Sequence, residues 1–214
     1  MPVEIKICGI KSADILEAAI LAGADYTGFV FFPKSPRNVQ LTEAAALVRL
    51  VRGRAKTVAL LVDPPDPLLD EVLTNVHPEV LQLHGKETFA RVEAIAARSG
   101  LPIWKAISVE TADDIAEATA YRNAGALPLF DAKPPKSLAN ALPGGNGLTF
   151  DWRFLAGVEK PFVLSGGLTP ETVADAIRLT GAPIVDVSSG VESAPGEKDP
   201  ERIREFIKRA RAAS

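Results

Sequence analysis

The chain has 214 residues, of which 47% are apolar and 24% are charged, and its formal net charge is −3. This length and composition indicate a globular protein with one large domain or two small ones, and the weak negative charge speaks against a general nucleic-acid-binding or membrane-binding surface. The single cysteine excludes an internal disulfide and is typical of a reducing cytoplasm. One cysteine and two histidines are also too few for a zinc site built from those residues.

The chain opens on a strand that ends at its only cysteine. Apolar and charged residues alternate from 3 to 7, which is the period-two pattern of a strand, and Cys8 and Gly9 follow where the chain turns. The charges in this segment speak against a signal peptide, and the longest apolar runs, such as 58–62, are far too short to span a bilayer. We therefore expect a cytoplasmic protein.

Strands and helices alternate along the rest of the sequence. We expect strands at 3–7, 26–32, 57–62, 80–83, 102–107, 126–130, 161–164 and 184–187. The helices that follow them are expected to begin after Ser12, Thr42 and Asp66, at Phe89, and after Thr111, Asp151, Thr169 and Asp199. The helix near 151–155 is stunted, and the long loop rich in Pro and Gly before it, at 134–147, is expected to be functional rather than a linker.

Eight strand–helix units of this kind predict one fold class. Apolar strands that each precede a helix indicate a parallel sheet, and eight right-handed units favour closure into a single (β/α)8 barrel, an α/β domain spanning 1–214. The alternative is an open doubly wound sheet. That fold usually carries a Gly-x-Gly-x-x-Gly motif after the first strand, and the motif is absent here.

The carboxyl ends of the strands of such a barrel form the active site, and two residues there suggest acid–base chemistry. Cys8 ends the first strand and Asp131 ends the sixth, so the barrel would place them on opposite sides of its mouth. A thiol can act as a base if its neighbours favour the thiolate, and a carboxyl can act as the acid. The alternatives are a buried packing cysteine and an aspartate that caps a helix.

Small residues after the last two strands suggest a phosphate site. These residues are Gly166, Gly167, Ser188, Ser189 and Gly190. They let backbone N–H groups approach an anion closely, and the loops after strands seven and eight are the usual phosphate site of this fold. Taken singly, each loop is equally consistent with a tight turn.

Two further strand-end residues are candidates for binding. Arg37 lies in a loop stiffened by two prolines, where its guanidinium could hold a carboxylate through two hydrogen bonds or could lie in solvent. His84 follows an apolar strand, and a lone histidine there is more often a structural residue.

Seven segments together resemble phosphoribosylanthranilate isomerases of tryptophan biosynthesis. The segments are 6–9 (KICG), 29–37 (FVFFPKSPR), 82–85 (QLHG), 130–133 (FDAK), 144–152 (GGNGLTFDW), 164–168 (LSGGL) and 186–192 (DVSSGVE). They occur in the family's order and cover essentially the whole chain. The departures are small: Phe32 stands where the family often has Tyr, and Asn146 stands where Thr or Ser is usual.

The resemblance implies an Amadori rearrangement of N-(5-phosphoribosyl)anthranilate to 1-(2-carboxyphenylamino)-1-deoxyribulose 5-phosphate. It implies that Asp131 is the general acid at the furanose ring oxygen and that Cys8 is the general base at the sugar C2. Arg37 would hold the anthranilate carboxylate, His84 would line the substrate site, and the loops at 166–167 and 188–190 would hold the phosphate. No cofactor or metal is expected, because the protonated imine of the substrate is itself the electron sink.

Two other functions remain open from the sequence. A pentose-phosphate epimerase would share the phosphate site, although a metal-dependent one would need more His and Asp ligands at the strand ends. A catalytically silent barrel could bind a phosphorylated ligand as a sensor. The expected partner is a small phosphorylated molecule in each case, with no nucleic acid and no membrane, and the protein is expected to be a monomer or a homodimer.

Overall fold

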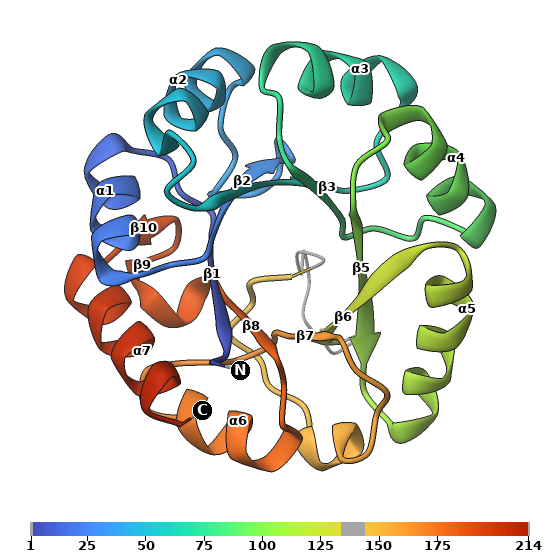
Figure 1. Ribbon diagram of the computed structural model, residues 1–214, viewed down its shortest axis with the longest axis vertical. Coiled ribbons are helices and arrows are strands. Elements are labelled where there is room, and N and C mark those ends of the chain that lie inside the picture. Colours follow the sequence, from blue (N-terminus) through green and yellow to red (C-terminus); the bar gives the residue numbers. More distant parts are fainter. Residues whose placement is uncertain (1, 134–143, 214) are drawn as a thin grey trace.

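The computed structural model describes residues 2–133 and 144–213, and its strands form a closed parallel barrel (Figure 1). Each strand is hydrogen-bonded to the next, and β8 pairs with β1. The predicted barrel is therefore confirmed. Its strands are β1 (Glu4–Cys8), β2 (Tyr26–Phe31), β3 (Lys56–Leu61), β4 (Val80–Leu83), β5 (Ile103–Val109), β6 (Ala126–Ala132), β7 (Val163–Leu164) and β8 (Ile184–Val187).

Helices surround the strands as an outer ring (Figure 1). The α-helices are α1 (Ala13–Ala22), α2 (Leu41–Val51), α3 (Asp66–Asn75), α4 (Phe89–Ser99), α5 (Glu117–Asn123), α6 (Val173–Thr180) and α7 (Pro200–Ala212). The 3-10 helices are η1 (Ala112–Ala116), η2 (Trp152–Leu155) and η3 (Ser189–Val191). The stunted helix predicted in the sixth unit is thus the single 3-10 turn η2.

Several element boundaries differ from the predicted ones. Helix α2 begins one residue before Thr42, because Gln40 and Glu43 form the capping box instead. Helix α3 begins at Asp66 itself, and α6 begins only at Val173, after a turn built on Thr169. A short hairpin in the loop after β8, β9 (Glu192–Ala194) with β10 (Glu197–Lys198), was not predicted. Of the loop at 134–147, positions 134–143 lie outside the described residues.

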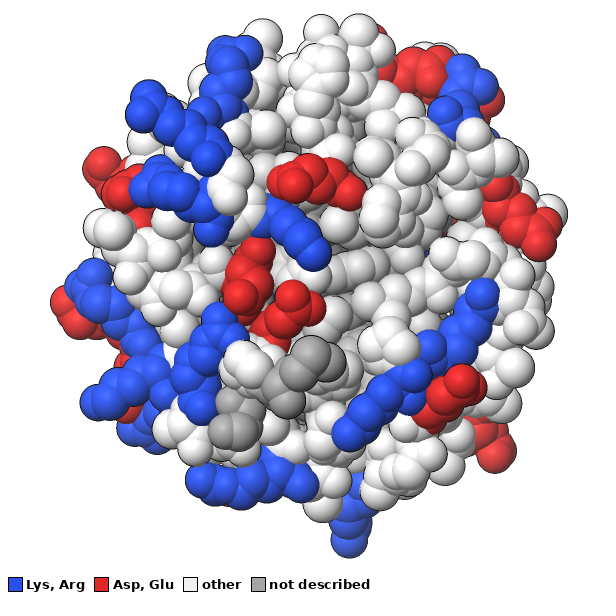
Figure 2. Space-filling model, in the orientation of Figure 1, with Lys and Arg blue, Asp and Glu red and all other residues white. Residues whose placement is uncertain are grey.

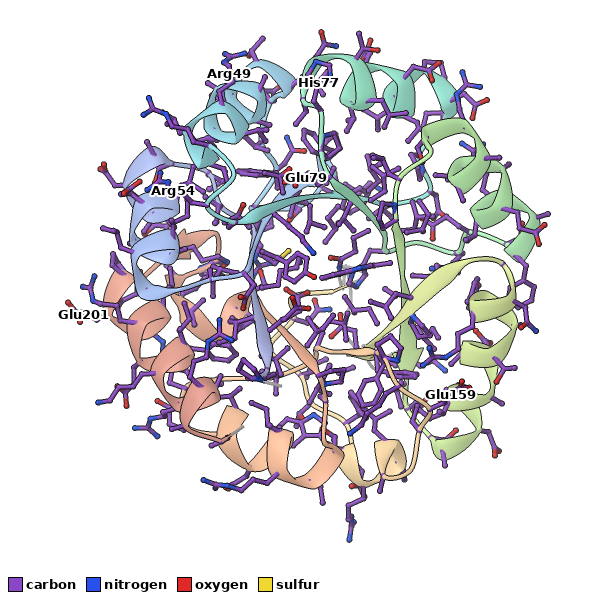
Figure 3. All side chains as sticks on the ribbon, viewed as in Figure 1. Arg49, Arg54, His77, Glu79, Glu159 and Glu201 are labelled. Carbon is purple, nitrogen blue, oxygen red and sulfur yellow. The ribbon has the colours of Figure 1, made fainter. Side chains whose placement is uncertain are left out.

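Period-two alternation divides each strand between two environments. In β1, Ile5 and Ile7 belong to the main core between barrel and helices, so Lys6 and Cys8 point into the barrel. A second cluster, made of alternate residues of the other strands, fills the interior toward one end: Tyr26, Val58, Val80, Trp104, Ala106, Leu129, Val163 and Ile184. Side chains project into the barrel interior in Figure 3. The barrel therefore has an apolar floor.

The same alternation places polar side chains above that floor. Lys6, Gln82 and Asp186 occupy the next interior positions along their strands, and Cys8 and His84 lie one step further, at the mouth.

Positive and negative side chains are interspersed around the face shown in Figure 2. Among residues 2–133 and 144–213, no helix is both long and apolar enough to cross a bilayer.

Candidate active site

A cavity opens at the carboxyl ends of the strands, and it unites the predicted chemical residues. Its lining includes Cys8, Arg37, His84, Asp131 and Ser188. These residues come from five different strand ends, which is where a barrel of this type assembles its chemistry. The walls between them are largely apolar, with Val30, Phe32, Leu60 and Val62 on one side. Such a cavity suits a ligand with an aromatic or other apolar part.

Cys8 lies at this cavity with only 3% of its surface exposed. Burial raises the pKa of the Cys8 thiol above its ordinary value, and Asp186 acts in the same direction. The ammonium groups of Lys6 and Lys198 oppose that rise. Reactive cysteines usually lie in an electropositive environment. Here burial and Asp186 favour the neutral thiol, so the ionisation of Cys8 depends on the nearby ammonium groups.

Asp131 lies in a hydrogen-bonded chain of buried side chains. Its Oδ1 accepts from the backbone N–H of Ala132 at 2.9 Å, and its Oδ2 lies 3.1 Å from His84 Nε2. The Gln82 side-chain nitrogen lies 2.9 Å from His84 Nδ1. Because an amide nitrogen only donates, Nδ1 accepts, and His84 Nε2 carries the proton shared with Asp131. His84 therefore lies in the site beside the predicted acid.

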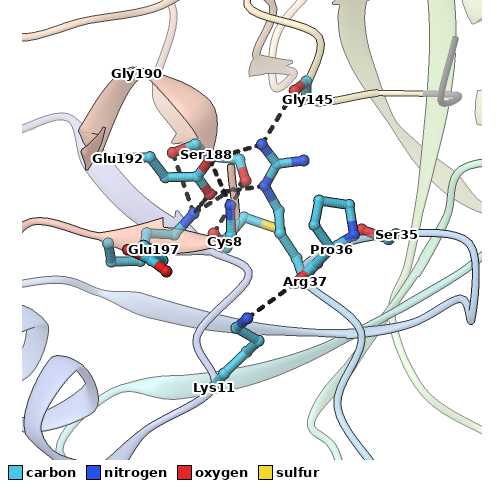
Figure 4. Close-up of polar contacts among 12 residues, drawn as sticks. Cys8, Lys11, Ser35, Pro36, Arg37, Gly145, Ser188, Gly190, Glu192 and Glu197 are labelled. Atoms are coloured by element: carbon cyan, nitrogen blue, oxygen red, sulfur yellow. Dashed lines mark hydrogen bonds and ion pairs between the residues drawn. The ribbon is translucent and has the colours of Figure 1, made fainter. Parts of the chain in front are cut away.

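Arg37 is a buried side chain and not a solvated surface residue, with 5% of its surface exposed. Its Nε and Nη2 each donate to a Glu192 carboxylate oxygen at 2.8 Å, and Nη2 also donates to the carbonyl of Gly145 at 3.1 Å. Figure 4 shows these hydrogen bonds of Arg37 beside Cys8 and Ser188. Lys198 Nζ donates at 2.5 Å to Oε1 of Glu192, the oxygen that Arg37 Nε also contacts, and at 3.2 Å to the Ser188 backbone oxygen.

The reasoning from sequence missed Glu192, Lys198, Lys6 and Asp186. Glu192 and Asp186 end and begin one of the segments that carry the family resemblance, so a signal for them existed. Lys198 lies in the unpredicted hairpin, and nothing in its local pattern distinguishes it from a surface lysine.

A second cavity adjoins the first and is lined mainly by loop backbone. Its residues are Asp131, Ala132, Gly145, Asn146, Gly147, Leu148, Ser165, Gly166, Gly167, Leu168, Asp186, Val187, Ser188, Ser189 and Gly190. All of the residues predicted to hold a phosphate are among them, together with part of the loop at 144–148. The two cavities share Asp131, Gly145, Ser165, Asp186 and Ser188, so one elongated ligand can occupy both.

The glycines of this second cavity are required by the local geometry. Gly167 has a φ of +68°, and a Cβ there would lie 2.7 Å from the carbonyl oxygen of Leu148. At Gly190 a Cβ would lie 1.8 Å from the carbonyl oxygen of Leu168. Only glycine permits these close approaches, which bring the loops together around a small space suited to an anion. In the part of the chain that is described, no group of three metal-ligating side chains is present.

Comparison with known proteins gives one consistent result. The family model described as N-(5'phosphoribosyl)anthranilate (PRA) isomerase matches residues 5–209. The chain is 52% identical to the N-(5'-phosphoribosyl)anthranilate isomerase of Parvibaculum lavamentivorans over 100% of both chains, and 56% identical to that of Paracoccus denitrificans over 99% of both.

Solved structures agree with the sequence relatives. Phosphoribosyl anthranilate isomerase from Thermotoga maritima is similar with a TM-score of 0.88 and 35% identity, over 98% of this chain and 99% of that one. A second similar structure is such an isomerase in complex with reduced 1-(o-carboxyphenylamino)-1-deoxyribulose 5-phosphate, with a TM-score of 0.84, 33% identity and the same coverage.

Proposed function

Because the chain belongs to the N-(5'-phosphoribosyl)anthranilate isomerase family, we propose that it catalyses the rearrangement of N-(5-phosphoribosyl)anthranilate to 1-(2-carboxyphenylamino)-1-deoxyribulose 5-phosphate in tryptophan biosynthesis. The observation that carries the proposal for this chain is the pair of joined cavities. One has a buried arginine and apolar walls, and the other has glycine-rich and serine-rich loops. The substrate likewise has an aromatic carboxylate at one end and a phosphate at the other.

The acid and the base would act where the two cavities meet. Asp131 lines both cavities, and Cys8 lines the first. In the first step, Asp131 in its protonated form gives its carboxyl proton to the furanose ring oxygen, so the C1–O bond breaks and the ring opens to a protonated Schiff base. His84 would support this step by holding the carboxyl of Asp131 in one orientation.

The second step moves a proton from carbon. Cys8 removes the proton from C2 of the sugar, the C2–H electron pair forms a C1=C2 double bond, and the C1=N π electrons move onto nitrogen, which gives an enolamine that tautomerises to the ketone. The protonated imine accepts these electrons, so the reaction needs no cofactor. What the protein contributes is the placement of one acid and one base on a substrate fixed at both ends, in a site with little room for water.

Arg37 and the loops would fix those ends. A Cβ at Gly145 would lie 2.6 Å from Arg37 Nη1, and both residues line the first cavity, so this nitrogen lies at the cavity wall. It can bind the anthranilate carboxylate as a charge-assisted donor. The backbone N–H groups at 166–167 and 188–190 would bind the phosphate.

The direct test is the reaction itself. Purified protein is mixed with freshly prepared N-(5-phosphoribosyl)anthranilate, and the loss of anthranilate fluorescence is followed. We expect enzyme-dependent loss that saturates with substrate. A pentose-phosphate epimerase would leave this signal unchanged but would interconvert pentose 5-phosphates, and a silent barrel would bind the substrate without turnover. Either result would contradict the proposed function.

A second proposal concerns the assembly and location of the protein. We propose a single-domain cytoplasmic enzyme that is a monomer or a homodimer. A dimeric phosphoribosylanthranilate isomerase is known from Thermotoga maritima, and monomeric forms of it have been generated. Light scattering of the purified protein distinguishes the two states, and a larger mass than that of two chains would contradict both.

A further inference from the structure

Lys6 is a fully buried cation directly below Cys8, and the mechanism above does not use it. None of its surface is exposed. It lies two residues before Cys8 on β1, so both side chains point into the barrel. Its Nζ is 2.9 Å from Asp186 Oδ1, on the neighbouring strand β8. A buried lysine loses considerable hydration energy, so its presence at this depth calls for a reason beyond packing.

Gly28 shows how close the lysine and the thiol are. This glycine pairs with Cys8 across β1 and β2. A Cβ at Gly28 would lie 3.0 Å from Lys6 Cε and 3.1 Å from Cys8 Sγ. The end of the lysine stem and the sulfur therefore converge on one point, and the missing side chain of Gly28 leaves that space to them. Any larger residue at 28 would separate the two groups or displace one.

The charges around the thiol indicate what the lysine does. Burial opposes the charge on Lys6, but Asp186 and Cys8 together outweigh burial and keep the pKa of the ammonium raised. Burial also raises the pKa of Cys8, and Lys6 is the strongest influence that opposes the rise. Lys198 helps from the loop after β8, whereas Asp186 acts the other way. Arg37, His84 and Asp131 face the same cavity.

We propose that Lys6 is a positioning residue that stabilises the thiolate of Cys8, with Asp186 holding the ammonium in place beneath the sulfur. This inference rests on the proposed function, in which Cys8 is the base. When the thiolate removes the C2 proton it becomes a neutral thiol, and Lys6 keeps its partner Asp186, so the cation stays compensated in both states. An apolar residue at position 6 would leave the base in its protonated form.

The test titrates the thiol itself, without substrate. The thiolate ultraviolet absorbance of the folded wild-type protein is measured against pH, with the spectrum of Cys8→Ser subtracted to remove the tyrosines. In Lys6→Met we expect the midpoint to rise by about one pH unit or more, the usual scale for losing an adjacent opposite charge. The matched control is Lys105→Met, because Lys105 is also buried and pairs with Glu87 at 2.8 Å, but on the outer face of β5. This control should leave the midpoint unchanged.

A double variant provides the same test if Lys6→Met alone does not fold. Lys6→Met with Asp186→Asn removes both charges, so no unpaired carboxylate remains buried. We expect its midpoint to rise as well, by less than in the single variant, because the effect of Lys6 on the thiol exceeds that of Asp186. Equal midpoints in wild type and in the folded variants, or no thiolate band in wild type below the pH of unfolding, would overturn the inference.

Kinetics separates this inference from the proposed function. Lys6→Met should lower kcat at neutral pH by about tenfold or more, with a smaller change in KM, since a midpoint about one pH unit higher leaves roughly one-tenth of the thiolate at neutral pH. If the midpoint rises but Cys8→Ser keeps wild-type turnover, Lys6 stabilises the thiolate and the assignment of Cys8 as base is wrong. If Cys8→Ser is inactive but the midpoint does not move, the proposed function stands and the role of Lys6 is structural only.

Discussion

Glu192 holds Arg37 through two parallel hydrogen bonds of 2.8 Å, and both side chains are almost completely buried. With the further bond to Gly145, this arrangement occupies Nε and Nη2 and leaves the two N–H groups of Nη1 at the cavity wall. A free arginine would have to give up rotamer freedom on binding a carboxylate. Here Glu192 has already fixed the guanidinium, so the binding group is preorganised.

Glu192→Gln should therefore weaken substrate binding. Burial opposes ionisation of Glu192, but Arg37 and Lys198 outweigh it and lower the pKa of this carboxyl to about 2, so it is charged at every working pH. Its amide replacement keeps the shape and loses one of the two acceptors. We expect KM to rise by about tenfold, on the scale of one charged hydrogen bond, with kcat changed much less. Glu17→Gln, at an exposed pair with Arg54, is the control. An unchanged KM would remove Glu192 from the binding site.

Arg37→Ala should have the larger effect on the same parameter. It removes the group that binds the substrate carboxylate, and it leaves the buried Glu192 with Lys198 and the backbone N–H of Gly196 as partners. Loss of a charged hydrogen-bonding group costs about 1.5–3 kcal/mol, which corresponds to a rise in KM of roughly 10-fold to 150-fold. Steady-state kinetics measures this rise, and circular dichroism checks the fold. If kcat falls while KM is unchanged, Arg37 acts in the chemical step and not on the carboxylate.

Ser189→Asp should abolish binding of inorganic phosphate. Ser189 lines the second cavity, and a carboxylate there would repel the anion. In wild type, phosphate should compete with substrate and raise the melting temperature, because a ligand that binds only the folded state stabilises it. Ser193→Asp, on the exposed hairpin, should keep both effects. A thermal shift that survives in Ser189→Asp would place the phosphate elsewhere.

Asp131→Asn should lower turnover by about a hundredfold or more, which is the usual scale for losing a general acid. An amide can still accept from the backbone of Ala132, so the fold and the binding of a product analogue should persist. Turnover is measured by the fluorescence assay and binding by calorimetry. A variant that turns over near the wild-type rate would show that another group protonates the ring oxygen.

The outline of this molecule follows from local sequence patterns, because each strand–helix unit carries its own periodicity and strand ends share one edge of a barrel. Cys8 and Asp131, at the ends of β1 and β6, could be placed at one mouth for that reason. The pairings among the site residues could not. Lys6 and Asp186 are 180 residues apart in sequence, and Arg37 and Glu192 are 155 apart, so only closure of the barrel brings them together.

The local features that the sequence did not predict have a related cause. Lys6 alternates with apolar residues like any half-exposed strand residue, but in a closed barrel both faces of a strand are buried, and the inner one can hold charge. Helix η2 has 4 residues, and the strands β9 and β10 have 3 and 2, which is too short for a period to be visible in sequence. Their conformation is set by the loops they pack against.

The turnover of Cys8→Ser tests the central claim most directly. Serine is close in size to cysteine, so the barrel should fold, and phosphate should still raise its melting temperature. A hydroxyl is a far poorer base than a thiol near neutral pH, so kcat in the fluorescence assay should fall by at least about a hundredfold while KM changes little. A folded Cys8→Ser protein that converts N-(5-phosphoribosyl)anthranilate at the wild-type rate would contradict the account, because Cys8 would then be a packing residue and the base would be another group.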